Sequence, residues 1–199
     1  MTSLRLAFFA SHNGSAMRAI CGACKSGELN ATPELVVSNN ANAPALAWAE
    51  DFGMNPHHLS VKKLGSPEAL DDAMLSKLIT SRVTHIVLSG YMRKLGPNTL
   101  HAYENHILNV HPSLLPAFGG KGMYGDNVHE AVLASGTRES GATVHLVTAD
   151  YDEGPILAQK KCPIGNDETL LSLKERIAPL EASLYIETLQ KLAHDLNNQ

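Results

Sequence analysis

An amide and an imidazole stand together at the end of a strand-like run in the second half of the chain. Asn109 and His111 are two residues apart, so the alternation of a strand places both side chains on one side. An amide can donate a hydrogen bond to a developing oxyanion, and an imidazole can transfer a proton near neutral pH. The sequence therefore predicts acid/base chemistry at this strand end.

An acidic turn at residues 150–153 offers the carboxylate that such chemistry needs. A carboxylate beside a histidine favours the protonated imidazole and fixes its orientation. Ser113 lies nearby but has neither a helix start nor the glycines of a nucleophile elbow around it. Direct transfer through a tetrahedral species is therefore favoured over a covalent enzyme intermediate. The alternative interpretation of these segments is a polar turn and a core-facing histidine.

A second candidate site follows the first strand-like run, at residues 11–16. Backbone N–H groups at a helix N-terminus, with Gly14 allowing close approach, can bind a phosphate. The loop is not the dinucleotide fingerprint, which requires three glycines, and no P-loop is present. The alternative is a tight turn in which Ser or Asn caps the following helix.

These residues need a scaffold whose strands end at one edge. Strands are expected at residues 4–10, 34–38, 84–89, 107–110, 142–148 and 155–162, and helices at 15–25, 43–52, 127–134, 167–192 and from Ser66 onward. This alternation predicts an α/β fold with a mostly parallel sheet and helices on both faces. The last two strands, joined by a short turn, should pair antiparallel, and Pro179 should break or kink the last helix. In such a sheet, ligands bind where the strand order reverses.

Charge and composition exclude several classes of protein. The 199 residues include 16 Lys+Arg and 20 Asp+Glu, a net charge of −4 with the histidines neutral, which does not suggest a nucleic-acid-binding surface. Apolar stretches of about five residues are far shorter than the roughly 18 that a membrane span requires. Without a secretory signal, repeat or linker, we expect one cytoplasmic domain over residues 1–199. Three cysteines fit a reducing compartment, and Cys21 and Cys24 lie inside an expected helix, which favours buried thiols over a metal or redox site.

Three segments together resemble the folate-dependent glycinamide ribonucleotide transformylase family: residues 109–116, residues 140–145, and residues 152–156 with Gln159. The similarity covers essentially the whole chain. It implies a single-domain Rossmann-like formyltransferase fold with an antiparallel C-terminal strand. It also implies transfer of a formyl group from 10-formyltetrahydrofolate to the amine of glycinamide ribonucleotide in purine biosynthesis, without a metal. The partners implied are small molecules, and a monomer and a homodimer both stay open.

The resemblance implies a role for individual residues as well. Asn109 would bind the oxyanion, and His111 would be the acid that helps the folate nitrogen leave. Asp152 would keep His111 protonated and organise a water that moves the proton, with His145 as a supporting neighbour. The nucleotide would be bound by Asn13, Gly14, Ser15, Ala16, Gly90, Pro112 and Glu181, and the folate by Tyr91, Met92, Arg93, Leu95 and Asp150.

The first loop departs from the family pattern Ser-Gly-x-Gly-Ser-Asn. His12 replaces a glycine and Ala16 replaces an asparagine, which leaves the identity of the phosphorylated substrate open. One alternative function is a hydrolase that releases formate from the same folate, since water could replace the amine; related deformylases carry an additional N-terminal domain. Another alternative is a non-catalytic nucleotide- or folate-binding protein. Asn109, His111 and Asp152 together argue against it, because binding alone does not require an acid/base pair.

Overall fold

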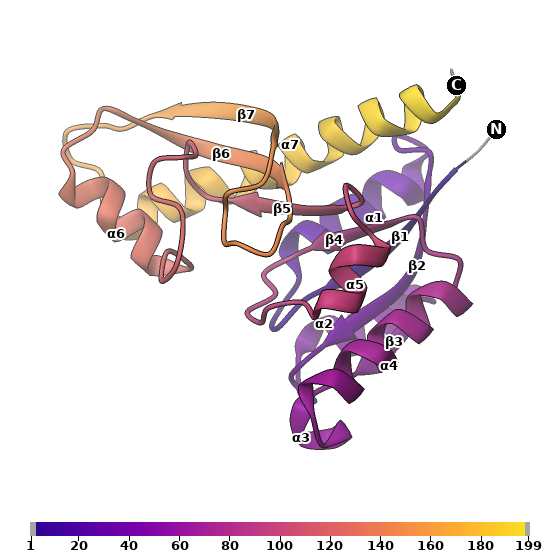
Figure 1. Cartoon of the computed structure of the whole chain (residues 1–199). Coiled ribbons are helices and arrows are strands. Elements are labelled where there is room, and N and C mark those ends of the chain that lie inside the picture. The colour runs from indigo at the N-terminus through magenta and orange to yellow at the C-terminus, as the bar shows by residue number, and fades with distance from the viewer. Residues whose placement is uncertain (1–2, 198–199) are drawn as a thin grey trace. The chain divides into compact units, whose positions relative to one another are not determined.

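The computed structural model describes residues 3–197. Its strands are β1 (Leu4–Phe9), β2 (Ala31–Ser38), β3 (Asn55–His58), β4 (His85–Leu88), β5 (Ile107–His111), β6 (Glu139–Leu146) and β7 (Ile156–Pro163). The helices are α1 (Ser15–Ser26), α2 (Pro44–Phe52), α3 (Val61–Leu64), α4 (Pro67–Thr80), α5 (Pro97–Ala102), α6 (Asp126–Ala134) and α7 (Leu170–Asn197) (Figure 1). Two compact units result: unit 1 is the chain through Leu108 and from Gln190 onward, and unit 2 is Asn109–Leu189.

The strands form one sheet in the order β3-β2-β1-β4-β5-β6-β7. β1 pairs in parallel with β2 and β4, and β2 pairs in parallel with β3, whereas β6 and β7 are antiparallel. The expected α/β class, the mostly parallel sheet and the antiparallel C-terminal pair are confirmed. The strand order reverses between β1 and β4, so the loops that follow these two strands lie at the reversal point.

The core of unit 1 forms because its central strands are apolar on both faces. In β1, Leu6, Phe8 and Phe9 are completely buried, which is the pattern of a parallel strand covered on two sides. Helix α4 begins as its sequence predicts, since the Ser66 hydroxyl accepts a hydrogen bond from the Ala69 N–H at 3.1 Å. Helix α1 ends at Gly27, whose φ of 81° lies in the left-handed region.

Helices α6 and α7 and strand β7 share an apolar cluster in unit 2. Val132 of α6, Cys162 of β7 and Leu173 and Ile177 of α7 are its buried members. All three cysteines of the chain are free, with Cys21 and Cys162 buried, and burial raises the pKa of the Cys24 thiol to about 11. Cys21 and Cys162 are thus buried thiols, whereas Cys24 is half-buried.

Several details of the expected secondary structure are wrong. β6 begins at Glu139 rather than at residue 142, and α7 begins at Leu170 rather than at residue 167. Strand β3 and the short helix α3 were not expected, because residues 55–58 read Asn-Pro-His-His and have no apolar run. The second strand begins at Ala31 rather than at residue 34. Helix α7 runs through Pro179 to Asn197 instead of ending near residue 192. β6 and β7 are joined by residues 147–155, which is longer than the short turn expected.

The continuity of α7 has a packing cause. Pro179 removes one helical hydrogen bond, but Ile177 before it and Leu184 and Tyr185 after it are buried. Apolar contacts on both sides of the proline outweigh the local penalty. Over residues 3–197 no helix combines the length and apolar character needed to cross a membrane.

Candidate functional site

In unit 1, the loop after β1 presents backbone N–H groups at the start of α1. Gly14 occupies the N-cap position with φ 62°, and no side chain caps the helix, so capping by Ser or Asn is wrong. The Met17 N–H is instead bonded to the Ser89 hydroxyl at 3.0 Å. The first N–H groups of a helix have no intrahelical acceptor. Within the described part of the chain, the N–H groups of Ser15 and Ala16 are therefore available to bind an anion.

Ser11 joins the loops that follow three strands of unit 1. Its hydroxyl donates to Asn39 Oδ1 at 2.6 Å and accepts from the Met92 N–H at 2.8 Å. Its own N–H donates to the Gly90 carbonyl at 3.1 Å. The loop after β1 is therefore tied directly to the loops after β2 and β4.

The residues after β4 divide into buried and exposed groups. Leu95 is buried, whereas Met92 and Arg93 are exposed. Tyr91 packs edge-on against Phe9, with ring centroids 5.3 Å apart. Its hydroxyl is buried and has no hydrogen-bond partner among residues 3–197, and burial raises its pKa to about 12. This loop therefore combines exposed side chains, including the Arg93 and Lys94 cations, with a buried leucine and a buried tyrosine hydroxyl.

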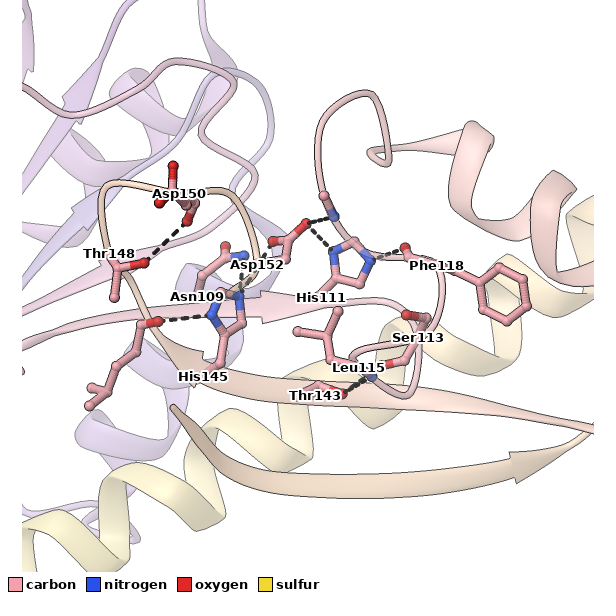
Figure 2. A network of polar contacts seen from close by, with 12 residues as sticks. Asn109, His111, Ser113, Leu115, Phe118, Thr143, His145, Thr148, Asp150 and Asp152 are labelled. Atoms are coloured by element: carbon pink, nitrogen blue, oxygen red, sulfur yellow. Dashed lines mark hydrogen bonds and ion pairs between the residues drawn. The ribbon is translucent and has the colours of Figure 1, made fainter. Parts of the chain in front are cut away.

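In unit 2, Asn109, His111, His145 and Asp152 form one polar cluster (Figure 2). Asn109 and His111 come from β5, His145 from β6 and Asp152 from the loop after β6. Asp152 Oδ2 lies 3.6 Å from His111 Nδ1, and Asp152 Oδ1 lies 3.6 Å from His145 Nε2. The structure thus brings together the four residues that the sequence places in the acid/base site.

His111 has a protein partner at each ring nitrogen. Nε2 is 2.7 Å from the Phe118 carbonyl oxygen, and because a carbonyl only accepts, Nε2 carries a hydrogen. Nδ1 faces Asp152, so a second proton on the ring would lie beside the carboxylate. His111 can pass a proton to a bound molecule only when one of these two contacts is exchanged for it.

The backbone holds the Asp152 carboxylate in place. Asp152 has φ 59°, a left-handed conformation that Asp adopts more readily than most residues. Its Oδ2 accepts a hydrogen bond from the Gly120 N–H at 2.9 Å, and its side chain is 11% exposed. A carboxylate held by a backbone donor is well oriented for the histidine beside it.

A layer of hydroxyl and amide groups supports the turn after β5. Thr143 of β6 donates to the Ser113 carbonyl at 2.6 Å and accepts from the Leu115 N–H at 3.0 Å. Gln159 of β7 donates to the Leu115 carbonyl at 2.9 Å. Ser113 is fully buried and donates to the Ala117 carbonyl, which is a structural role.

Sequence reasoning assigned no role to Thr143. The spacing of the strand could have indicated its position, since Thr143 and His145 are two residues apart and share one face of β6. Phe118 and Gly120 contribute backbone groups to the cluster, and their residue types do not indicate these contacts.

The other predicted residues of unit 2 lie in varied surroundings. Asp150 is exposed and Pro112 half-buried. Glu181 on α7 is half-buried, and desolvation raises the pKa of its carboxyl to about 8. One turn later, the buried Tyr185 is hydrogen-bonded to the backbone of Val110, between Asn109 and His111. Among the described residues, no group of three or more His, Cys, Asp or Glu could hold a metal ion.

Comparison with known proteins defines the class of this fold and cluster. The family model described as Formyl transferase matches residues 4–189, and the chain therefore belongs to the formyl transferase family. A Bacillus subtilis (strain 168) protein named phosphoribosylglycinamide formyltransferase is 37% identical over 195 residues, which cover 98% of this chain and 97% of that protein. A chloroplastic protein of the same name from Vigna unguiculata is 38% identical over 96% of this chain.

The chain spans 61% of the Vigna unguiculata protein's length. Among solved structures, glycinamide ribonucleotide transformylase 1 from Geobacillus kaustophilus superimposes with a TM-score of 0.88 at 36% identity, covering 96% of this chain and 100% of that one. The resemblance inferred from the three sequence segments is confirmed at the level of the family.

Proposed function

We propose that this chain transfers a formyl group from 10-formyltetrahydrofolate to the amine of glycinamide ribonucleotide, a step of purine biosynthesis. The observation that carries the proposal is the cluster of Asn109, His111, His145 and Asp152 in unit 2, in a chain of the formyl transferase family. Relatives named for this reaction share more than a third of their aligned residues with the chain.

The chemistry needs a donor for a negative oxygen and an acid for a leaving nitrogen. The substrate amine attacks the formyl carbon, and the carbonyl electrons move to oxygen. A free N–H of Asn109 stabilises that oxyanion. When the electrons return, the bond from carbon to the folate nitrogen breaks. That nitrogen gains a proton from His111, and the attacking amine loses one, so the proton count balances.

Asp152 serves the proton transfers from its fixed position. Its carboxylate orients the His111 ring and attracts the water that takes the proton from the attacking amine. Since the Phe118 carbonyl accepts from His111 Nε2, the proposal requires this contact, or the contact with Asp152, to give way to the substrate. His111 then returns to its starting state when it takes up the proton released by the amine.

The binding groups belong to the same proposal. The N–H groups at Gly14, Ser15 and Ala16 would bind the nucleotide phosphate, with Asn13, Gly90, Pro112 and Glu181 as further nucleotide contacts. Tyr91, Met92, Arg93, Leu95 and Asp150 would form the folate site. A backbone phosphate site tolerates the exposed His12 and the small Ala16.

A formyl-transfer assay tests the function directly. The purified protein is incubated with 10-formyltetrahydrofolate, with and without glycinamide ribonucleotide, while formylated nucleotide and free formate are both measured. We expect formylated product only when the nucleotide is present. Formate release at the full rate without the amine would instead identify a hydrolase, and binding of both ligands without turnover would identify a non-catalytic protein.

We also propose that the chain acts as one domain in the cytoplasm, as a monomer or homodimer with small-molecule partners and no nucleic acid. The free cysteines Cys21, Cys24 and Cys162 are compatible with a reducing compartment. The net charge of −4 supports ligand binding by local groups rather than by a broad basic surface. Light scattering of the purified protein, with and without substrates, measures the oligomeric state.

A further inference from the structure

The backbone beside His145 determines which ring nitrogen carries a hydrogen in the neutral imidazole. The residue is 2% exposed, and its Nδ1 lies 2.9 Å from the carbonyl oxygen of Leu146. A carbonyl oxygen only accepts, so Nδ1 carries the hydrogen. In a neutral imidazole the other nitrogen, Nε2, is then an acceptor.

The acceptor nitrogen of His145 decides which way the Asn109 amide faces. Nε2 lies 3.1 Å from Asn109 Nδ2, so one amide N–H is donated to His145. The two ends of a carboxamide have nearly the same shape, and only their hydrogen-bond partners distinguish them. His145 therefore fixes the nitrogen end toward itself and leaves the second N–H of Asn109 for another oxygen.

We propose that His145 is a positioning residue for formyl transfer: its unprotonated Nε2 holds the Asn109 carboxamide in the orientation that presents an N–H, and not a carbonyl, to the reacting oxygen. This inference rests on the function proposed above. It gives His145 a task that Asn109 cannot perform for itself, since a reversed carboxamide would repel the oxyanion.

Protonation of His145 would oppose this arrangement. An Nε2–H would face the Asn109 N–H, and the carboxamide would have to turn over to accept a hydrogen bond. The charged groups that act on His145 are Asp152 from the loop after β6 and His111 from β5; its partner on β7, Ile156, is apolar. Burial lowers the pKa of His145 despite the opposing influence of Leu146 and Asp152, so the acceptor form persists at neutral pH.

Two substitutions distinguish the hydrogen-bonding role of His145 Nε2 from the role of the imidazole in packing. In His145→Gln, the side-chain carbonyl can accept from Asn109 but cannot titrate, and in His145→Leu the acceptor is lost. We expect His145→Leu to lower kcat about 10- to 100-fold, less than the loss of a whole oxyanion donor, with KM changed less than about threefold. His145→Gln should recover kcat to within about fivefold of the unsubstituted protein.

The pH profile adds a readout that a packing role would not move. In the unsubstituted protein, protonation of His145 should contribute to the fall of kcat on the acid side of the pH profile. His145→Gln should lose this contribution and show a shallower fall. The exposed His101 on α5 provides the matched control, because His101→Gln should leave the profile unchanged. Equal losses of kcat in His145→Gln and His145→Leu, or no loss in His145→Leu, would overturn the inference.

A spectroscopic measurement separates this inference from the proposed reaction. Nitrogen-15 NMR of the ligand-free protein at pH 7 reports which nitrogen of each histidine carries hydrogen, with His145→Gln used to assign the signals. We expect His145 to be protonated at Nδ1 only. A hydrogen on Nε2 would refute the positioning role whatever the activity, whereas the expected tautomer in a protein without formyl transfer would refute the proposed function alone.

Discussion

At the scale of single residues, Asp152 combines an uncommon backbone conformation with a half-buried carboxyl group. Its φ of 59° suits Asp and Asn but is strained for most other residues. The Gly120 N–H donates to its Oδ2, and one ring nitrogen of each neighbouring histidine lies 3.6 Å from a carboxylate oxygen. A change to Asn therefore removes the carboxylate and keeps the backbone conformation. A change to Ala would also strain the backbone.

Asp152→Asn and His111→Ala should each lower turnover by about two to four orders of magnitude, the usual contribution of a positioned acid/base group. The reason is that His111→Ala removes the proposed acid, and Asp152→Asn removes the carboxylate beside it. Steady-state formyl transfer measures the effect, with thermal unfolding as the control for folding. Near-normal turnover in a folded Asp152→Asn protein would contradict the mechanism.

Glu181 should make the ligand-free protein less stable as pH rises. The pKa of this carboxyl is raised to about 8 from 4.5, so between these values the folded state holds a proton that the unfolded state has released. By linkage, stability falls from about pH 4.5 to pH 8 and then levels off. Glu181→Gln should remove this decline and raise Tm at pH 8 by at least about 2 °C. Calorimetry at several pH values checks this; an unchanged slope would refute it.

The sequence indicates the residue types of the site better than their contacts. Asn109, His111 and Asp152 were predicted because an amide, an imidazole and a carboxylate have recognisable chemistry. Phe118 and Gly120 contribute a backbone carbonyl and a backbone N–H, which every residue type carries. No property of their side chains could have predicted those contacts.

At the scale of elements, the antiparallel pair β6 and β7 positions His145 and the acidic turn. The two strands approach so closely at Gly141 that an added Cβ would lie 2.0 Å from the Lys160 carbonyl oxygen. At Gly22 in α1 an added Cβ would meet nothing within 4 Å. These two glycines make a matched pair for testing how tightly the pair of strands is packed.

Gly141→Ala should destabilise the protein by about 1–3 kcal/mol, because the methyl group forces the two strands apart. Gly22→Ala should stabilise it by roughly 0.5–1 kcal/mol, since alanine is favoured over glycine within a helix. Chemical denaturation of both variants measures the two changes. Equal stabilities would show that β6 and β7 can separate without cost.

Elements with a strong apolar pattern were predicted, and those stabilised by their neighbours were not. β4 is buried along its length and β1 at every position but Arg5, and both were evident from their apolar runs. β3 is an edge strand of polar residues, and among the described strands it pairs with β2 alone, so its pairing is visible only in the fold. The continuation of α7 through Pro179 likewise depends on tertiary packing, which local propensity cannot reveal.

At the scale of the whole molecule, each unit contains a titratable group whose pKa is shifted by burial. The two groups change the stability of the protein with pH in opposite directions. In unit 1, His85 is buried at the start of β4, and burial lowers its pKa to about 4 from 6.5, helped by His106. The unfolded chain then binds a proton over this range that the folded protein excludes. Stability due to His85 is complete above about pH 6.5 and is lost as pH falls toward 4. This trend opposes that of Glu181 where the two ranges overlap.

His85→Gln should therefore reduce the acid sensitivity of the whole molecule. The shift corresponds to about 3 kcal/mol at most between pH 7 and pH 4, or several degrees in Tm. Thermal unfolding from pH 7 to pH 4 measures it, with His101→Gln as the exposed control. An acid-induced loss of Tm as large in His85→Gln as in the unsubstituted protein would contradict this account.

The Ser11 hydroxyl ties the loop after β1 to the Met92 N–H, and we expect this bond to make binding of the two proposed substrates thermodynamically coupled. A ligand that orders the loop assigned to phosphate also orders the loop assigned to the pterin, and the second ligand then loses less conformational entropy on binding. Linkage makes this benefit reciprocal. Nucleotide should therefore bind more tightly in the presence of folate. Calorimetric titrations measure the nucleotide affinity with and without folate, and the ratio of these two affinities should fall toward one in Ser11→Ala.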